Sequence, residues 1–273
     1  RIPLPFVKRT FLKLDNQTYR LDYLLLRIPV QARKFIFIPL NGSLYHRSFL
    51  ADRSLKRGSI TITDSSVMIA FSRKTDDLEP GGQIGIDVNE RNITWSDTKG
   101  RTEKVNISEV AEIKERYKTI RAEIAQGTQR DRRMQQRLLS KYGKRERDRT
   151  IQRIHQVTKK VVEHSKANRL GIVIEKLTGI RKLYRKGNGQ GRSYRGRLNS
   201  WSFKEIQRQV EYKARWEGVH VDYVNPRGTS RNCLCGSRVV ALAGRRLYCP
   251  ECDRTWDRDV IASKNMMAAP LVR

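Results

Sequence analysis

The chain has 273 residues, among which 57 Lys and Arg stand against 28 Asp and Glu, giving a formal net charge of +29 at pH 7. Such an excess indicates a polyanionic partner, because every phosphate that a basic side chain neutralises releases counterions and adds affinity for nucleic acid. The longest apolar runs, at 23–26 and 35–40, are far shorter than the roughly 20 residues of a membrane-spanning helix, so we expect no membrane partner and no signal peptide.

Residues 1 to about 80 are predicted to form a small β-barrel or sandwich. Short β-branched and aromatic runs alternate there with Gly and Pro turns, and the acidic, Gly- and Pro-containing linker at 76–82 marks a domain boundary. Because the chain begins at Arg1 rather than Met, we expect an N-terminal portion of this domain to be missing from the sequence. The expected strands lie at 7–12, 23–26, 34–38 and 59–63.

From Gln83 onward the pattern predicts an α/β domain. Strands and helices follow in the order βββ–α–β–α–β–α, which is that of the ribonuclease H fold. The long helical region at 108–167 is expected to be interrupted at Gly127 and Gly143, which would give a helical hairpin or a kinked pair of helices. The expected strands lie at 83–88, 92–96, 103–107, 170–175 and 219–224, and a further helix at 202–217. The predicted domains are a nuclease domain at 83–224, a cysteine-rich insertion at 225–256 and a closing motif with the C-terminal helix at 257–273.

Three acidic residues stand where two-metal catalysis would need them. Asp87 and Glu175 each follow an apolar strand, and Asp259 opens a helix. Two paired strands and an adjoining helix can bring these carboxylates together, where two Mg²⁺ or Mn²⁺ ions would bind the scissile phosphate, the attacking water and the leaving 3′ oxygen. Taken singly, each acid is explained as well by a turn or a helix cap, and Asp257 by a loop that closes the insertion. The joint pattern favours catalysis.

The four cysteines have the spacing of a structural zinc ribbon. Cys249 and Cys252 form a C-x-x-C knuckle, whereas Cys233 and Cys235 are one residue closer together than the usual pair. Four thiolates make a closed structural zinc site, and their clustering in one window suits a reducing cytosol. The alternative is a set of buried free cysteines, which the turn residues Gly236 and Pro250 disfavour.

The segment at 181–197 interleaves basic residues with tyrosines and contains no acidic residue. Guanidinium groups hold phosphates while tyrosine rings stack on bases, a combination suited to single-stranded nucleic acid. The glycines of this segment indicate a mobile loop, which we expect to act as a lid over the active site. The candidate nucleic-acid-binding residues are Arg181, Lys182, Tyr184, Arg185, Lys186, Arg192, Tyr194, Arg195 and Arg197.

Three segments, at 85–92, 174–177 and 257–265, resemble the RuvC motifs of TnpB (OrfB), a protein of bacterial and archaeal insertion sequences that is related to type V CRISPR effectors. The second Asp of the third motif is the catalytic one, which here is Asp259. The residues that lead into that motif, at 201–203, 211–214 and 225–230, are similar as well.

This resemblance implies an RNA-guided DNA endonuclease of an insertion sequence. A guide RNA from the transposon end and a target DNA would be its partners, Mg²⁺ or Mn²⁺ its catalytic ions and Zn²⁺ its structural ion. Residues 1–80 would be the later part of a wedge-like β-barrel, and the family's N-terminal recognition segment would be absent from this sequence. The resemblance further implies a cytoplasmic, nucleoid-associated protein of a prokaryote, with a monomer as the expected state.

Two other functions fit the same residues. A ribonuclease H-like transposase would use the three carboxylates to join DNA ends, and a joining assay separates it from a nuclease. A guided regulator would bind without cutting, and it would be expected to have lost part of the triad, which is intact here. The zinc ribbon before the last acid favours the TnpB interpretation over the transposase.

Overall fold

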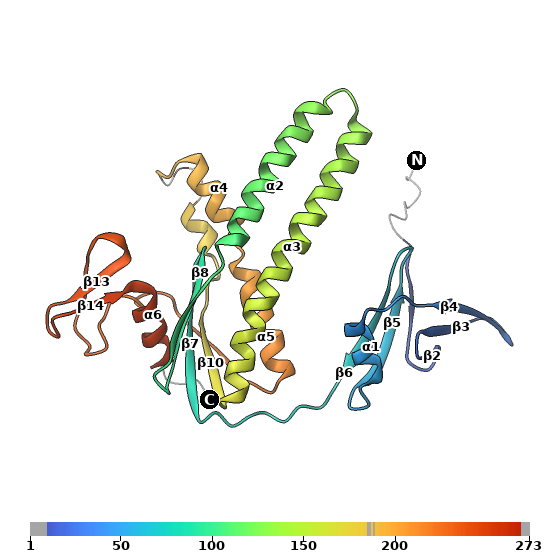
Figure 1. The fold of residues 1–273 in the computed structure, drawn as a ribbon, viewed down its shortest axis with the longest axis horizontal. Coiled ribbons are helices and arrows are strands. Elements are labelled where there is room, and N and C mark those ends of the chain that lie inside the picture. Colours follow the sequence, from blue (N-terminus) through green and yellow to red (C-terminus); the bar gives the residue numbers. More distant parts are fainter. Residues whose placement is uncertain (1–9, 185–186, 188, 269–273) are drawn as a thin grey trace, which may run out of the picture. The chain divides into compact units, whose positions relative to one another are not determined.

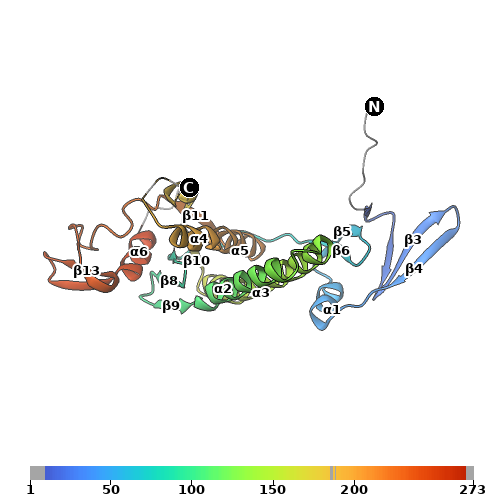
Figure 2. The same cartoon turned by 90° about the horizontal axis from the view of Figure 1, so that it is seen from above.

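The computed structural model describes residues 10–184, 187 and 189–268, which fall into two compact units, Arg1–Thr75 and Asp76–Arg273. The chain can be followed by colour in Figure 1 and, turned by 90°, in Figure 2. Each unit is described by itself. Among the described residues, no helix combines the length and the apolar character needed to cross a membrane.

The first unit contains two three-stranded antiparallel sheets and one helix. Its core consists of Tyr19, Leu21, Leu26, Ile28 and Ile60, and the Tyr19 hydroxyl donates to the Gly58 carbonyl at 2.7 Å. One sheet has the order β1-β5-β6 and the other β2-β3-β4. The elements are β1 (Leu12–Leu14), β2 (Arg20–Asp22), β3 (Leu25–Gln31), β4 (Lys34–Pro39), α1 (Leu44–Ala51), β5 (Lys56–Ile62) and β6 (Val67–Ser72).

Several strand predictions for this unit were wrong in their bounds. The strand expected at 7–12 begins only at Leu12, and positions 7–9 lie outside the described residues. The strand expected at 23–26 begins at Leu25, because Tyr23 has a φ of 49° and belongs to the turn after β2. Helix α1 and strand β6 were not predicted.

The second unit is built on a five-stranded mixed sheet with the order β11-β10-β7-β8-β9. Strands β7, β8 and β9 pair antiparallel, whereas β10 runs parallel to both β7 and β11. All six residues of β10 are buried, as expected for a strand covered on both faces. The strands are β7 (Gly82–Val88), β8 (Asn92–Asp97), β9 (Thr102–Asn106), β10 (Leu170–Glu175) and β11 (Val221–Val224).

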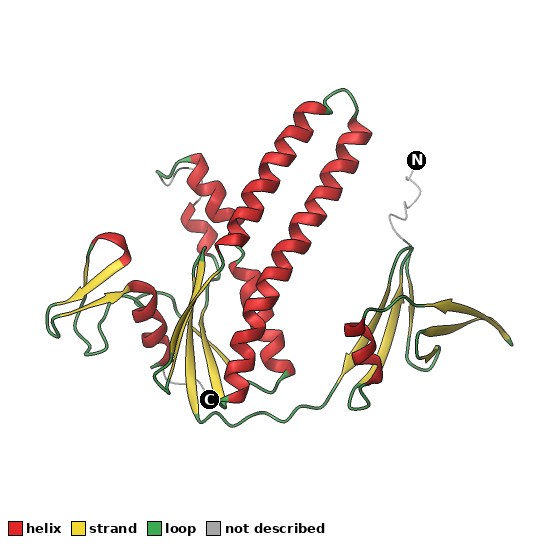
Figure 3. Cartoon of the chain, viewed as in Figure 1, coloured by secondary structure: helices red, strands yellow, loops and turns green. Residues whose placement is uncertain are grey.

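Helices cover the two faces of this sheet (Figure 3). Alternate residues of β7 and β10, such as Ile84 and Ile172, join the large core with helices α3 (Arg132–Ala167) and α5 (Phe203–Trp216). Because successive side chains of a strand point to opposite faces, Val173 instead packs against α6 (Arg258–Met267). The position of Asp87, one residue after the core residue Ile86, therefore places its side chain on the α6 face.

Helices α2 (Ser108–Gly127) and α3 form the expected hairpin, but Gly143 does not interrupt it. A glycine inside a helix costs about 1 kcal/mol relative to alanine, which the contacts between the two helices can offset. One such contact is the ion pair between Arg121 and Glu146, and another joins the rings of Tyr117 and Tyr142 at 6.4 Å.

The polar pair of buried Asp97 and partly buried His164 ties α3 to the end of β8. His164 Nε2 lies 2.8 Å from Asp97 Oδ2, and the backbone N–H groups of Lys99 and Arg101 donate to Asp97 Oδ1. Burial alone would raise the pKa of Asp97, but these hydrogen bonds hold that pKa below its usual value.

The cysteine-rich segment forms a small antiparallel sheet with the order β12-β13-β14. Its last strand leads directly into α6, where Asp257 caps the helix by accepting from the backbone N–H groups of Asp259 and Val260. The strands are β12 (Val240–Ala241), β13 (Arg246–Cys249) and β14 (Arg254–Asp257), and a 3₁₀ turn, η2 (Ala243–Arg245), joins the first two.

Candidate active site and cysteine cluster

Gly85 allows α6 to lie directly against strand β7. A Cβ atom at this position would lie 2.1 Å from the carbonyl oxygen of Ser263 and 2.5 Å from the backbone nitrogen of Met267, so no larger residue fits without moving the helix. The Ser263 hydroxyl also lies 2.7 Å from the Ser96 hydroxyl of β8, in the buried layer between helix and sheet. This close approach fixes how near α6, which carries Asp259, lies to β7, which carries Asp87.

The structure brings the three predicted carboxylates to one cavity of about 570 Å³. Asp87 comes from β7, Glu175 from the end of β10, and Asp259 from the first turn of α6. All three are buried: Asp87 and Glu175 are 8% exposed and Asp259 is 0% exposed. The cavity is also lined by Arg227, Arg245, Arg258, Thr229 and Trp201.

Asp87 and Glu175 lie in surroundings that oppose their ionisation. Burial, followed by repulsion from Glu175 and Asp259, raises the pKa of Asp87 to about 7, although the Asn89 side-chain amide donates to Asp87 Oδ2 at 2.6 Å. Burial also raises the pKa of Glu175, against the hydrogen bond of 2.7 Å that the Thr229 hydroxyl donates to its Oε1. Carboxylates that repel one another in a buried cavity favour a bound cation.

Asp259 differs because two basic side chains neutralise it. Burial would raise its pKa, but ion pairs with Lys104 and Arg245 hold that pKa below its usual value. Lys104 Nζ lies 2.8 Å from Asp259 Oδ2, yet this oxygen accepts no hydrogen bond of good geometry from any described residue. A buried carboxylate oxygen without a hydrogen bond is a candidate ligand for a metal ion.

Sequence reasoning missed Lys104, Arg245, Thr229 and Asn89. The register of the antiparallel sheet is a signal that could have found Lys104, because Asp87 pairs with Thr94 and Thr94 pairs with Lys104. Residues opposite one another share a face, so Lys104 stands on the face of the carboxylates. Arg245 comes from the turn between β12 and β13, and no pattern in the sequence indicates where that turn lies.

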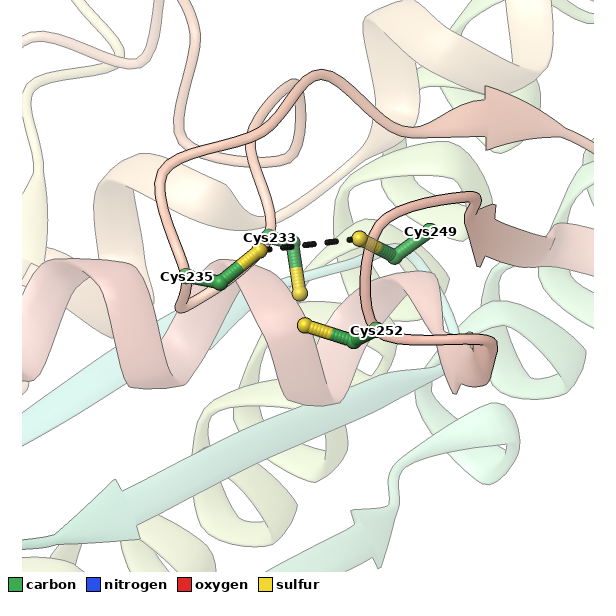
Figure 4. A group of neighbouring side chains, drawn as sticks. All are labelled: Cys233, Cys235, Cys249 and Cys252. Carbon is green, nitrogen blue, oxygen red and sulfur yellow. Dashed lines mark hydrogen bonds between the residues drawn. The ribbon is translucent and has the colours of Figure 1, made fainter.

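The four cysteines converge on one point (Figure 4). Their sulfur atoms all lie within 4.8 Å of one another, and Cys235 Sγ is 3.6 Å from Cys249 Sγ. Tetrahedral zinc with Zn–S bonds of about 2.3 Å would separate its sulfur ligands by about 3.8 Å, so the spacing fits. The cluster is compatible with a structural zinc ion, and the close Cys233–Cys235 pair takes part in it.

The segment expected to be a mobile lid is partly helical. It contains a 3₁₀ turn, η1 (Ile180–Tyr184), and helix α4 (Arg192–Ser200), while Arg185 and Lys186 lie outside the described residues. Contacts with the turn between β7 and β8 and with α2 anchor α4, since Arg197 Nε lies 3.2 Å from Glu90 Oε2 and Lys114 Nζ donates to the Ser200 carbonyl. The interpretation as a loop was therefore wrong for these residues.

Comparison with known proteins shows the family of the chain. A family model described as "Cas12f1-like, TNB domain" matches residues 203–266. TnpB-like protein MJ0751 of Methanocaldococcus jannaschii is 31% identical over 250 residues, which cover 88% of this chain and 89% of the relative. The chain belongs to the TnpB-like family. A second member from the same organism, TnpB-like protein MJ1635, is 21% identical over 263 residues, which are 95% of this chain but 58% of the relative.

The TnpB-like chain also shares its fold with solved Cas12 structures. Cas12f1, in the cryo-EM structure of its complex with sgRNA and target DNA, matches with a TM-score of 0.65 at 13% identity over 94% of this chain. CasPhi-2 (Cas12j) bound to crRNA matches with a TM-score of 0.50 at 11% identity over 89% of this chain. The TnpB-like chain spans 59% of the Cas12f1 chain and 60% of the CasPhi-2 chain.

Proposed function

We propose that this chain is a metal-dependent, RNA-guided DNA endonuclease that hydrolyses phosphodiester bonds at Asp87, Glu175 and Asp259. The observation that carries the proposal is the meeting of these three buried carboxylates at one cavity, although they come from three separate elements. Burial, together with repulsion from Glu175 and Asp259, raises the pKa of Asp87. Asp259 Oδ2 lies beside Lys104 but accepts no hydrogen bond of good geometry from a described residue, and both features suit a divalent cation.

The architecture supports a ribonuclease H-like (RuvC) domain. Three antiparallel strands, β7 to β9, are followed by β10, which pairs parallel with β7, and by β11, which pairs parallel with β10. Helix α6 is the last described element. We assign residues 83–224 and 257–273 to this domain and 225–256 to an inserted zinc ribbon. Residues 1–80 would be a wedge-like domain.

The carboxylates would hold Mg²⁺ or Mn²⁺. Two such ions stabilise the attacking and leaving oxygens of an in-line displacement and lower the pKa of a bound water. The protein's own contribution is to fix the ligands: Thr229 holds Glu175 and Asn89 holds Asp87 by hydrogen bonds. Arg227 and Arg258 line the same cavity and would neutralise a phosphate that enters it.

The partners we propose are a guide RNA from the transposon end and a target DNA. Support comes from the net charge of +29 and from the related fold of Cas12f1, whose structure holds both kinds of nucleic acid. The basic residues of η1 and α4 remain our candidates for contact with single strands. Two of them already have partners within the chain: Arg195 is partly buried and donates to the Gln190 carbonyl, and Arg197 pairs with Glu90.

The test is guided cleavage by protein that is co-expressed with its native locus and carries the RNA that copurifies. Wild-type protein should cut target DNA in Mg²⁺, and Asp87→Asn should lower the rate about a thousandfold, since a bound metal contributes several kcal/mol to transition-state stabilisation. Glu103→Gln is the matched control, because Glu103 lies on the same sheet with its side chain 42% exposed. It should cut at the wild-type rate.

Three outcomes would contradict the proposal. If Asp87→Asn still cleaved DNA at the wild-type rate, the carboxylate group would not be required for catalysis. Guided binding without cutting, by wild-type and variant alike, would support a nuclease-silent regulator. Joining of DNA ends in place of hydrolysis would support a strand-transfer transposase.

A further inference from the structure

One side chain from the cysteine-rich segment reaches into the carboxylate cavity. Arg245 lies in the turn between β12 and β13 with a φ of 64°, a conformation that few residues other than glycine adopt. Its guanidinium group donates to Asp259 Oδ1 and, at 3.0 Å, to Asn89 Oδ1. Because Asn89 donates in turn to Asp87, Arg245 is linked to two of the three carboxylates.

Arg245 can leave this position more easily than its partners can. Its side chain is 51% exposed, whereas that of Asp259 is 0% exposed and is fixed on the first turn of α6. The second cation, Lys104, is also held by Asp257, whose Oδ2 accepts from Lys104 Nζ at 2.9 Å. A divalent cation that binds Asp259 is repelled by the adjacent Arg245 guanidinium, and Arg245 is the less constrained of the two basic partners, so it is the one that can withdraw.

We propose that Arg245 is a positioning residue that holds the carboxylate site in its metal-free form and is displaced when a divalent cation binds. Cation loading then releases the turn at 243–246 from the cavity and couples the cysteine-rich segment to the active site. This inference rests on the proposed function, because it requires a cation at Asp87 and Asp259.

The coupling is reciprocal. If the cation releases the turn, then loss of the Arg245 contact favours the cation by the same factor. We expect Arg245→Gln to bind Mn²⁺ about tenfold more tightly, within the usual range of such couplings. Loss of a positive charge alone would also tighten binding, so affinity by itself does not identify a displacement.

The deciding experiment measures Mn²⁺ binding and hydrogen exchange of the 243–246 turn on the same zinc-loaded, full-length protein. In the wild type, Mn²⁺ should speed exchange in this turn. Arg245→Gln should exchange fast without Mn²⁺ and show no further change. Lys104→Gln removes an equal charge from Asp259 but keeps the Arg245 contact, so its turn should still respond to Mn²⁺. Arg246→Gln, a change of the exposed neighbouring residue, should behave as the wild type.

The outcomes separate this inference from the proposed function. Suppose that Mn²⁺ binds the wild type but not Asp87→Asn, and that hydrogen exchange at 243–246 of the wild type does not change. This result would overturn the displacement of Arg245 and leave the proposed function standing. Mn²⁺ that fails to bind, or that binds Asp87→Asn equally well, would overturn both. Equal zinc content in all variants would show that their cysteine-rich segments remain folded.

Discussion

The cysteine cluster and the carboxylate cavity are two candidate metal sites built in opposite ways. The cysteines lie between positions 233 and 252, so two tight turns suffice to bring their sulfur atoms within 4.8 Å of one another. The carboxylates lie between positions 87 and 259 and come together through the pairing of β7 with β10 and the packing of α6 on the sheet. The local site has soft ligands that fit zinc, and the distant one has hard oxygens that fit magnesium.

The two sites differ in what a bound metal would stabilise. A zinc ion at the cysteines would hold together a segment with few buried apolar residues, among them Leu247. The carboxylate site needs no metal to form, since Lys104 and Arg245 already balance the charge of Asp259. We therefore expect metal removal to unfold the first region and to inactivate the second.

The largest effect is expected from Cys249→Ser. Structural zinc contributes roughly 10 kcal/mol or more to the folding of small zinc domains, so the variant should lose its zinc and the segment at 225–256 should become sensitive to protease. Arg254→Gln, which changes the exposed residue paired with Cys249 across the β-ladder, is the control and should keep zinc. Elemental analysis and limited proteolysis measure both, and a protease-resistant segment without zinc would contradict the account.

Asp87 and Asp97 should give opposite pH dependences. The pKa of Asp87 is raised to about 7 in the folded protein, so without Mg²⁺ the free energy of unfolding should fall as pH rises from 3.8 to 7. At about 1.4 kcal/mol per pKa unit, this loss amounts to at most about 4 kcal/mol. The pKa of Asp97 is lowered, so its contribution is present above pH 3.8 and is lost as pH falls below that value.

The two asparagine variants test this contrast. In urea denaturation at pH 7 without Mg²⁺, Asp87→Asn should be more stable than the wild type and Asp97→Asn less stable. Each variant is the control for the other, because both residues are buried acids of the same sheet. Destabilisation of similar size by both would show that the carboxylate cavity is not under electrostatic strain.

Gly85→Ala should destabilise the protein by about 1–3 kcal/mol, the usual cost of overpacking. The added methyl group must push α6 away from β7, so guided cleavage should fall as well, through the displacement of Asp259. Gly81→Ala is the matched control, because its nearest neighbour would be the Arg169 carbonyl oxygen at 3.8 Å. Equal stability and activity of the two variants would show that the close helix–strand contact is not required.

The smallest effect is expected from Gly143→Ala, far from both metal sites. A Cβ atom there meets nothing within 4 Å, and alanine favours the helix, so stability should rise by about 0.5–1 kcal/mol. Urea denaturation measures this change. A loss of stability would mean that α3 is kinked at Gly143, as the sequence had led us to expect.

Apolar runs predicted the central strands well. The strand expected at 83–88 corresponds to β7, and the one at 170–175 has the bounds of β10, because buried strands consist of β-branched residues that few other structures favour. The helical hairpin at 108–167 was predicted from a similar signal, namely helical periodicity. Helices α1 and α4 were missed, because short helices are held by distant contacts, such as Arg197 with Glu90.

The candidate site could be predicted only in part. The three acids could be found because each stands at the end of an apolar strand or at the start of a helix: Asp87, Glu175 and Asp259. Their meeting at one cavity agrees with the order of strands and helices on which their selection was based. Recognising elements along the chain does not by itself find the cations Lys104 and Arg245. Their positions depend on the sheet register and on the path of a turn, which composition and periodicity do not encode.

The most direct test of the account is anomalous difference density from crystals of the zinc-loaded protein soaked in Mn²⁺. We predict a zinc peak among the four cysteines and manganese density in contact with Asp87 and Asp259, with the Arg245 guanidinium withdrawn from Asp259. Manganese density elsewhere, or an empty cavity with Arg245 still paired to Asp259 at saturating Mn²⁺, would contradict the claim that these carboxylates form a metal-dependent active site.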